Sequence, residues 1–553
     1  MDKKNHHLDN YSLLKSIIFK LKCFDYDEGS YLIVLYAFLY KYSSDILKDH
    51  FLSVIEDEEL TLDEAYRDDG YQMIFKDDAF HMFGYYFDKS DAFIDEIIND
   101  KYSDELFIWE FVESFSKNIS FFGGGNYKKY FSFMYDVIND YFNFKSFDFN
   151  SEKAMYLKDI ILTISKLNVF DDDLYIADVF NEVSNLILRR YNKTPNYINQ
   201  ILSALAFSDK NHAQNIYIPY LEDASLIFEI SNHCNFINFY GKEPNILLYC
   251  CAIVKLFLGF YDLDYVFIDN SNVRDSVDAG VKYYDFIISK ISDNYKMRSN
   301  NTQKLELSKR NTRDELEAIL SSNFNIDEDS FTEDAVLSNA LENLIDKMNF
   351  DNDDNFQFSK EYESLKDNEY LFLINLINSL KNDGVMAISI SQSFLSRNYL
   401  NLLRKYLICE INAVDAVISI QNSMGKYPNH EVIVIFKRDR TDENILFVEM
   451  SEKFSINRSS VGISGRNFSL DNSSIDKLLD VYKNKKVIEK FSNLVSIDEI
   501  KRNEYSLVIS RYVDTFEGEF IKLNDLRNEK KKLESNLKLL DDKINDMMDD
   551  LDL

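Results

Sequence analysis

The side chains best suited to metal or nucleophilic chemistry are few and scattered. No two histidines have the spacing of a metal site, and no Cys-x-x-Cys occurs. A Walker phosphate loop and a Gly-x-Ser-x-Gly nucleophile turn are also absent. We therefore expect no bound metal, and we interpret the odd number of cysteines as buried thiols of a reducing compartment. The residues concerned are His6, His7, His50, His81, His212, His233 and His430, with Cys23, Cys234, Cys250, Cys251 and Cys409.

Two charged runs follow one another in the middle of the chain. Between residues 296 and 313 there are six basic residues against Glu306 alone, a pattern that fits either a phosphate-contacting loop or a solvated one. Between 327 and 369 fourteen acids stand against three lysines. That stretch predicts a solvated insertion at about 325–369, with DNA mimicry as the alternative. The DNA-contact candidates are Lys296, Arg298, Lys304, Lys309, Arg310 and Arg313.

The whole chain is strongly acidic. Over 553 residues, 62 basic and 94 acidic side chains give a net charge of −32, which argues against a non-specific nucleic-acid coat. DNA contact through a local basic groove or a basic partner stays open. No signal peptide is visible, and the most apolar run, 246–261, is shorter than the ~20 residues of a membrane span and contains Lys255. We expect a soluble cytoplasmic protein without a membrane segment.

The helices and strands that must position any site are indicated by two different sequence patterns. With only 14 glycines and 4 prolines, helices are favoured over turn-rich β structure, and residues 11–167 show helical spacing. From about Phe180, β-branched runs alternate with amphipathic segments, which is typical of an α/β fold with a largely parallel sheet. Gly384 is predicted to end a helix. The expected strands are 235–240, 265–269, 285–289, 385–391, 414–420 and 432–437, and the expected helices are 246–260, 370–380 and 399–409.

The C-terminal segment carries a heptad stripe. Apolar residues three and four apart continue from Leu523 to Leu551, interrupted by Lys530. We interpret 519–553 as a coiled-coil-like helix that docks on a partner chain; a helix packed on the protein's own core is the alternative. The docking residues are Leu526, Leu533, Leu537, Leu540, Ile544, Met547 and Leu551. The predicted domains are 1–170 (helical), 171–455 (α/β), 456–518 (C-terminal extension) and 519–553 (heptad helix).

Several segments of the α/β region match known motifs. Residues 239–245 read Phe-Tyr-Gly-Lys-Glu-Pro-Asn, and 506–514 read Ser-Leu-Val-Ile-Ser-Arg-Tyr-Val-Asp. In order and spacing they resemble the modification (methyltransferase) subunit of type I restriction-modification systems, which is an adenine-specific DNA methyltransferase. The resemblance implies a Rossmann-like S-adenosylmethionine-dependent methyltransferase domain, and a C-terminal helix that packs with the specificity subunit. Further matching segments are 178–183, 192–198, 268–272, 380–391, 394–408, 415–420 and 431–437.

The resemblance also indicates a cofactor site, and there the chain departs from the family. The family's first motif, Asp-Pro-Ala-Cys-Gly-Ser-Gly-Ser, reads here Ile218-Pro219-Tyr220-Leu221-Glu222-Asp223-Ala224-Ser225. Both glycines are lost, so side chains should fill the space, and the two carboxylates should repel the carboxylate end of the cofactor. Glu243 corresponds to the acid that binds the ribose hydroxyls. The vestigial cofactor-binding set is Thr194, Pro195, Pro219, Ser225, Glu243 and Asn272.

The catalytic motif differs as well. The family has Asn-Pro-Pro-Phe or Asn-Pro-Pro-Tyr after an apolar strand. The Asn side chain and the carbonyl of the first Pro accept hydrogen bonds from the adenine amine, and the aromatic ring of the Phe or Tyr stacks on the flipped base. Here the strand 284–289 continues into Lys290-Ile291-Ser292-Asp293. A lysine offers no acceptor. Neither Asn-Pro-Pro nor Asp-Pro-Pro occurs anywhere in the sequence.

These observations leave enzymatic activity open and favour one function over two others. Our first hypothesis is a catalytically degenerate modification-subunit-like protein that acts as a DNA-clamping or scaffold subunit with a specificity subunit and needs no cofactor. The second is an active adenine-specific DNA methyltransferase that uses S-adenosylmethionine. The third is a stand-alone interaction protein on a methyltransferase fold.

Overall fold

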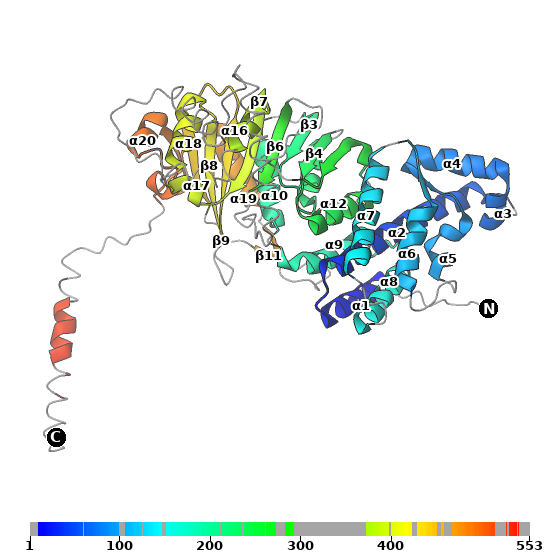
Figure 1. The fold of residues 1–553 in the computed structure, drawn as a ribbon. Helices are drawn as coiled ribbons and strands as arrows, with labels where there is room; N and C mark the ends of the chain where they lie inside the picture. The colour runs from blue at the N-terminus through cyan, green and yellow to red at the C-terminus, as the bar shows by residue number, and fades with distance from the viewer. Residues whose placement is uncertain are drawn as a thin grey trace, which may run out of the picture.

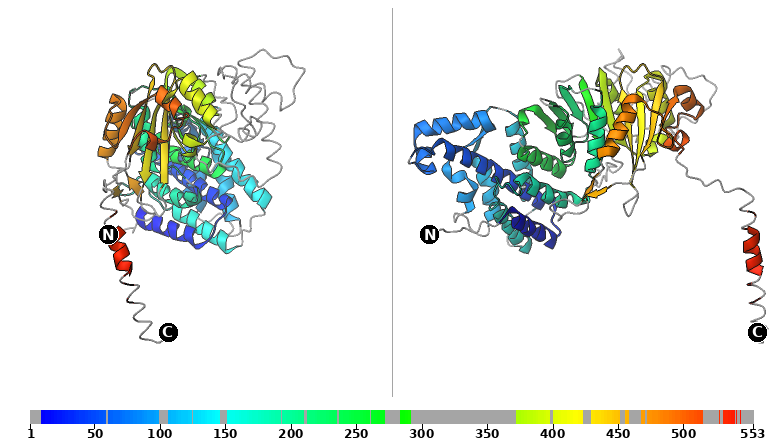
Figure 2. Two further views of the ribbon diagram at one scale, coloured as in Figure 1. Left: turned by 90° about the vertical axis from the view of Figure 1, so that its left-hand side faces the viewer. Right: turned by 180° about the vertical axis from the view of Figure 1, so that it is seen from behind.

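The fold was analysed on a computed structural model, which shows a helical region at one end and a large sheet towards the other (Figures 1 and 2). The structure describes residues 9–514 apart from 59, 99–105, 124, 146–150, 192, 210–211, 235–236, 260, 272–282, 292–371, 398–399, 423–428, 451–454, 458–466 and 470–471, and then residues 527, 530–538, 540 and 543.

The N-terminal region is helical, as expected, with one antiparallel pair of three-residue strands that lie far apart in the chain. Side-chain caps begin several of its helices: Asp27 accepts from the Ser30 N–H before α2, and Thr61 with Glu64 forms a capping box on α3. The elements are α1 (Asn10–Cys23), α2 (Glu28–Val54), α3 (Leu62–Arg67), α4 (Asp69–Phe83), β1 (Tyr85–Phe87), α5 (Ile94–Ile98), α6 (Phe107–Asn118), β2 (Ile119–Phe121), α7 (Asn126–Lys145) and α8 (Glu152–Ile164).

A nine-stranded mixed sheet follows, in the order β13-β10-β8-β9-β7-β6-β3-β4-β5. Strands β5, β4, β3, β6 and β7 are mutually parallel, whereas β9 runs antiparallel to β7 and β8. The strands are β3 (Asn215–Ile218), β4 (Asn238–Lys242), β5 (Val266–Asp269), β6 (Tyr284–Lys290), β7 (Leu380–Ile390), β8 (Val414–Asn422), β9 (Asn429–Lys437), β10 (Asn444–Met450) and β13 (Ser492–Ser496). This is the predicted Rossmann-like α/β architecture.

Helices cover the faces of this sheet. The helix α10 (Asn196–Ala206) packs on β6 and β7 and against α11 (Ser225–Ser231), whereas α9 (Ile176–Ile187) and α12 (Ile246–Leu258) pack against α2 of the N-terminal region. The other elements are α16 (Phe372–Asn378), α17 (Ser393–Ser396), α18 (Asn401–Lys405), the π-helix Tyr406–Glu410, α19 (Asn472–Asn484), α20 (Ile497–Arg502) and the short hairpin of β11 (Ser455–Asn457) and β12 (Asn467–Ser469).

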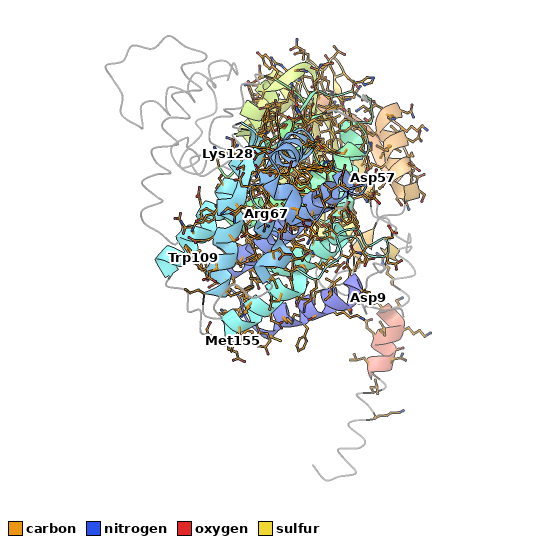
Figure 3. All side chains as sticks on the ribbon, turned by 90° about the vertical axis from the view of Figure 1, so that its right-hand side faces the viewer. Asp9, Asp57, Arg67, Trp109, Lys128 and Met155 are labelled. Carbon is orange, nitrogen blue, oxygen red and sulfur yellow. The ribbon has the colours of Figure 1, made fainter. Side chains whose placement is uncertain are left out.

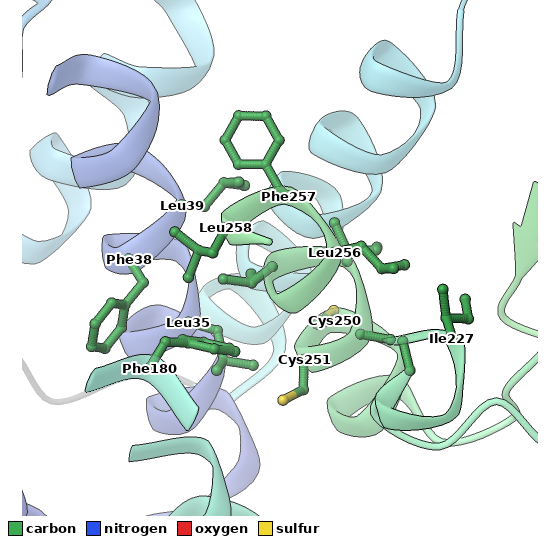
Figure 4. Packing of buried hydrophobic residues seen from close by; sticks show 14 of the residues in the cluster. Leu35, Phe38, Leu39, Phe180, Ile227, Cys250, Cys251, Leu256, Phe257 and Leu258 are labelled. Carbon is green, nitrogen blue, oxygen red and sulfur yellow. The ribbon is translucent and has the colours of Figure 1, made fainter. Parts of the chain in front are cut away.

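One hydrophobic cluster joins the helical region to the sheet. Phe38 of α2 packs edge-on against Phe180 of α9, with ring centroids 5.3 Å apart, and Tyr42 meets Phe257 of α12 in the same way at 5.2 Å. Figure 4 shows α2 and α12 facing each other across this contact. Because the apolar helix α12 also packs beneath the sheet, the part of the sheet formed by β3, β4 and β5 and the N-terminal region share a core.

Helix α7 covers the free edge of the sheet. The Val266 carbonyl of edge strand β5 accepts from the Asn126 side-chain amide at 3.1 Å and from the Tyr130 hydroxyl. The Ile268 N–H donates to the same hydroxyl, and the Lys129 ammonium donates to the Ile268 carbonyl at 3.0 Å. Side chains therefore satisfy edge groups that would otherwise be open to pairing with another chain.

Three sequence expectations need correction. Gly384 does not end a helix: α16 stops at Asn378 and Gly384 lies inside β7, because the strand starts earlier, at Leu380. The strand β3 was not predicted. Cys23 is exposed, although all five cysteines are free thiols and Cys250 and Cys251 are buried, as expected.

Candidate functional site

The site lies at the carboxyl ends of β3, β4 and β6, the edge where α/β sheets bind ligands. The loop from Pro219 to Ala224 links β3 to α11 and is held at both sides. Its Leu221 N–H donates to the Lys242 carbonyl at 3.0 Å, and its Tyr220 N–H donates to the Ser289 hydroxyl at 3.1 Å. The loop is therefore fixed between β4 and β6.

Two residues of this loop have a backbone conformation that favours glycine. Glu222 has φ 53° and Ala224 has φ 62°, both in the left-handed region. They stand where the resembling family has its two glycines. A side chain in this conformation costs about 1–2 kcal/mol per residue. The turn thus keeps a glycine-type backbone without the glycines.

The side chain of Glu222 is buried and hydrogen-bonded to Thr194. Its carboxylate accepts the Thr194 N–H and the Thr194 hydroxyl, both at 2.8 Å. Burial raises the pKa of the Glu222 carboxyl, and the hydrogen bonds from Thr194 act against that rise. Glu222 therefore ties the loop to the segment that enters α10.

Glu243, directly after β4, is fully buried and uses both carboxylate oxygens internally. One accepts the Glu222 N–H at 2.8 Å and the other accepts the Asn245 N–H at 2.9 Å. The Asn270 side-chain amide donates to the Glu243 carbonyl at 2.7 Å. Thr194, Glu222 and Glu243 thus form a continuous hydrogen-bonded chain, which we call the Thr194–Glu243 chain.

Asp223 is buried between two lysines. Lys193 contacts its carboxylate at 2.5 Å and Lys255 at 3.3 Å, and the Ser225 hydroxyl donates to it at 2.6 Å. Burial would raise the pKa of Asp223, but Lys255 and Lys193 hold it well below its usual value. We expected Asp223 to repel the carboxylate end of a cofactor, but two ammonium groups balance its charge.

The residue at the position of the family's catalytic motif, Lys290, is also paired with a buried charge. Lys290 ends β6 and contacts Glu431 of β9 at 2.7 Å, with both side chains largely buried. The other oxygen of Glu431 accepts the Ser389 hydroxyl at 3.1 Å. Ile291 follows and is buried. An ion pair across β6, β7 and β9 therefore lies where the family pattern has its adenine-binding asparagine.

Comparisons with known proteins were made at the level of sequence and of fold. A family model described as N-6 DNA Methylase matches residues 286–519. The Type I restriction enzyme MpnII methylase subunit of Mycoplasma pneumoniae is 21% identical over 417 residues, which are 71% of this chain and 68% of that protein. The MjaVII methylase subunit of Methanocaldococcus jannaschii is 35% identical over 85 residues, 15% of this chain and 14% of that protein.

Among solved structures, the methyltransferase subunit of a type I restriction-modification system from Streptococcus thermophilus superposes with a TM-score of 0.65 and 18% identity. The match covers 92% of this chain and 99% of that one. The chain resembles a type I methyltransferase subunit. In this methyltransferase-subunit-like chain the family match starts inside β6 and excludes the loop 218–225 and Glu243.

The structure places the predicted site residues unevenly. Thr194, Pro195, Pro219, Ser225 and Glu243 lie around the one loop, with Pro195 capping α10 and Ser225 opening α11. Of the docking stripe, Leu533, Leu537 and Leu540 are described and exposed. Outside the described residues lie Asn272, Ser292 and Asp293, the DNA-contact candidates at 296–313, the acidic insertion, and the docking residues Leu526, Ile544, Met547 and Leu551.

Sequence reasoning did not predict the oppositely charged partners of Asp223 and Lys290. Lys193 and Lys255 neutralise Asp223, and Glu431 pairs with Lys290. One signal was available: Lys255 is the one charged residue of the apolar helix α12, and a buried lysine needs a partner. Lys193 and Glu431 carried no such signal.

Two features are absent from the residues that the structure describes. No group of three His, Cys, Asp or Glu side chains there is arranged to hold a metal ion. Within the same residues, none of the helices combines the length and the hydropathy that crossing a bilayer requires.

Proposed function

We propose that this chain is a catalytically degenerate modification subunit that acts as a DNA-clamping or scaffold subunit with a specificity subunit. The observation that carries the proposal is the Thr194–Glu243 chain. Glu243 is the acid expected to bind the ribose hydroxyls. Its two carboxylate oxygens instead accept hydrogen bonds from the N–H groups of Glu222 and Asn245. Thr194 gives its N–H and its hydroxyl to Glu222. The groups that would bind a cofactor thus bind one another.

S-adenosylmethionine does not fit these residues. A glycine turn lets the cofactor approach the backbone, whereas here the same backbone carries the side chains of Glu222 and Ala224. The catalytic position supports the same interpretation, because Lys290 is paired with Glu431 and supplies no acceptor for an adenine amine. We therefore assign no methyl-transfer step to this chain.

The partner side of the proposal comes from the resemblance. In the family the C-terminal helix packs with the specificity subunit, and the described part of the heptad stripe is consistent with that: Leu533, Leu537 and Leu540 are exposed on a helix. A second solved structure, which concerns complex assembly of the type I restriction-modification system, aligns at 12% identity with a TM-score of 0.50. A chain lacking residues after Gly518 should lose the complex with the specificity subunit, and an intact complex would contradict the docking role.

Isothermal titration of the full chain with S-adenosylmethionine tests the catalytic side. We expect no heat from protein whose circular dichroism shows that it is folded. Micromolar binding would overturn the proposal and favour the active methyltransferase. That alternative further requires transfer of a labelled methyl group to adenine in DNA, and loss of the transfer in Glu243→Ala.

A further inference from the structure

Helix α1 presents aromatic and basic side chains to solvent along one side. Tyr11, Lys15, Phe19 and Lys22 follow one another at intervals of four, four and three residues. At 3.6 residues per turn these positions lie within about 80° of the helix circumference, so they form one face. Tyr11 is 39% exposed and Phe19 is 68% exposed, and both lysines are exposed. We call these four residues the α1 face.

The other side of α1 holds the helix on the protein. Leu13, Ile17 and Leu21 are buried, and the helix packs against α8 and α9. Figure 3 views this region from its outer end, with Asp9 at the start of α1 and Met155 on the neighbouring α8 labelled. Among the described residues, the hydrophobic core that contains these leucines includes neither Tyr11 nor Phe19. The packing of α1 therefore does not account for its two exposed rings.

The α1 face is positively charged. The helix contains three lysines and no acidic residue. Lys20 pairs with Asp159 of α8 at 2.7 Å. Within the described part of the chain, no carboxylate lies at ion-pair distance from Lys15 or Lys22. The Lys15 ammonium lies over the Tyr11 ring, 4.0 Å from its centroid, which keeps this charge on the α1 face. Two positive charges beside two aromatic rings are thus open to a ligand.

Acidic residues lie beyond both ends of the α1 face. The Asn10 side-chain amide donates to the carbonyls of Asn168 and Leu174, both at 2.8 Å, which places the acidic loop between them beside the first turn of α1. A second acidic segment follows the last turn. A long polyanion laid along α1 would meet carboxylates at each end, whereas a short anionic ligand would not. These acids are Asp9, Asp171, Asp172 and Asp173 at one end, and Asp25 and Asp27 at the other.

We propose that the α1 face is a docking site for a short acidic amphipathic helix of a partner protein. Apolar side chains of that helix contact Tyr11 and Phe19, and its carboxylates pair with Lys15 and Lys22. The two lysines are seven residues apart, about 10 Å along the axis, a spacing that two carboxylates seven residues apart on the partner helix reproduce. The net charge of −32 opposes this pairing only weakly, because salt screens charges more than about 8 Å away.

The same features disfavour the other occupants. A nucleic-acid strand or an anionic membrane would extend past the α1 face onto the acids at its ends. The α1 face of a second copy would bring lysine against lysine. The docking site is independent of the proposed loss of catalysis.

The test uses the full chain and two labelled synthetic helical peptides. One carries leucine on one face with glutamates seven residues apart beside it, and the other has glutamine in place of each glutamate. Fluorescence anisotropy should show binding of the glutamate peptide, and the glutamine peptide should bind about fivefold more weakly, because two exposed ion pairs are lost.

Variants of the chain locate the binding. Phe19→Gln keeps every charge and should bind the glutamate peptide about tenfold more weakly, because the apolar contact is lost. The double variant Lys15→Gln, Lys22→Gln should bind it about fivefold more weakly. The control is Lys128→Gln with Lys483→Gln, which removes the same charge at exposed sites elsewhere and should leave binding unchanged. An unchanged urea midpoint would show that each variant is folded.

Each other outcome overturns the proposal. Failure of the glutamate peptide to bind would remove the site, and equal binding of the glutamine peptide would remove the charge match. Equal binding by Phe19→Gln would mean that charge alone attracts the peptide. An equal loss in the control double variant would place the peptide elsewhere. Displacement of the peptide by a single-stranded oligonucleotide would assign the α1 face to nucleic acid.

Discussion

Two buried carboxylates lie at opposite ends of the strands of the sheet, which we call its carboxyl edge and its amino edge. Asp223 follows β3 at the carboxyl edge, and Asp415 lies at the start of β8, at the amino edge. Each is held by cations: Asp223 by Lys193 and Lys255, and Asp415 by three basic groups and a hydroxyl. The partners of Asp415 are Lys485 at 2.9 Å, Lys437 at 3.4 Å, the Arg440 Nε at 3.1 Å and the Tyr482 hydroxyl at 2.8 Å.

The surroundings of the two carboxylates differ. The partners of Asp415 join α19 to the ends of β8 and β9, so that cluster holds the fold together. The left-handed residues near Asp415 are Asn412 and Asp439, types that tolerate the conformation, and Lys485, which does not. Asp223 lies between Glu222 and Ala224, both of which are left-handed within the loop itself. The family match includes 415 and excludes 223. The contrast teaches that the family match extends over the structural edge, where Asp415 lies, and stops short of the loop at the carboxyl (ligand) edge, where Asp223 lies.

The largest expected effect is at the structural edge. Asp415→Ala leaves Lys485, Lys437 and Arg440 without their common carboxylate, and breaking a buried pair costs about 3–5 kcal/mol. Urea unfolding should show that loss. The control is Asp480→Ala, because its pair with Lys486 is about half exposed; there the loss should be much smaller, because water and salt screen an exposed ion pair. Equal losses would remove the structural role of the Asp415 cluster.

Much of this contrast was beyond the sequence alone. Long apolar runs predicted β6, β7, β8 and β9, since a buried strand needs a continuous apolar stretch. β3 (Asn215–Ile218) and β10 (Asn444–Met450) were not predicted, although β5, which is as short as β3, was. The missing glycines pointed to the altered loop, but the pairing of Lys290 with Glu431 joins residues 141 apart and leaves no local pattern. The prediction that Gly384 ends a helix was wrong, because a glycine after a helical pattern resembles a helix stop.

The next effect concerns the Thr194–Glu243 chain at the ligand edge. Glu222→Ala removes the acceptor of the buried Thr194 N–H and hydroxyl, and should cost about 1–3 kcal/mol of unfolding free energy. Glu222→Gln keeps an acceptor and removes the charge. It should therefore cost less than Glu222→Ala at every pH, as measured by urea midpoints.

The pH dependence tests the titration of the Glu222 carboxyl itself, which both variants lack. The folded pKa of Glu222 is raised above the ordinary value of 4.5, so the folded wild type holds this proton more tightly than the unfolded chain does. Wild-type stability from this group is thus present below pH 4.5 and is lost as pH rises through the folded pKa. Glutamine does not titrate, so the stability of Glu222→Gln relative to wild type should increase with pH across that window. A flat difference would mean that the carboxyl is not the strained group.

The smallest effect isolates the backbone of the loop. Ala224 at φ 62° and Ala37 in the middle of α2 are both fully buried, so replacing either by glycine removes the same methyl group and adds the same freedom to the unfolded chain. Only at 224 does glycine also relieve a left-handed conformation, which is worth about 1–2 kcal/mol. Ala37→Gly should therefore destabilise by about 1 kcal/mol, and Ala224→Gly should be neutral or stabilising in the same thermal unfolding assay. If both variants lose equal stability, the ligand-edge loop stores no strain, and the difference between the two edges reduces to their charges.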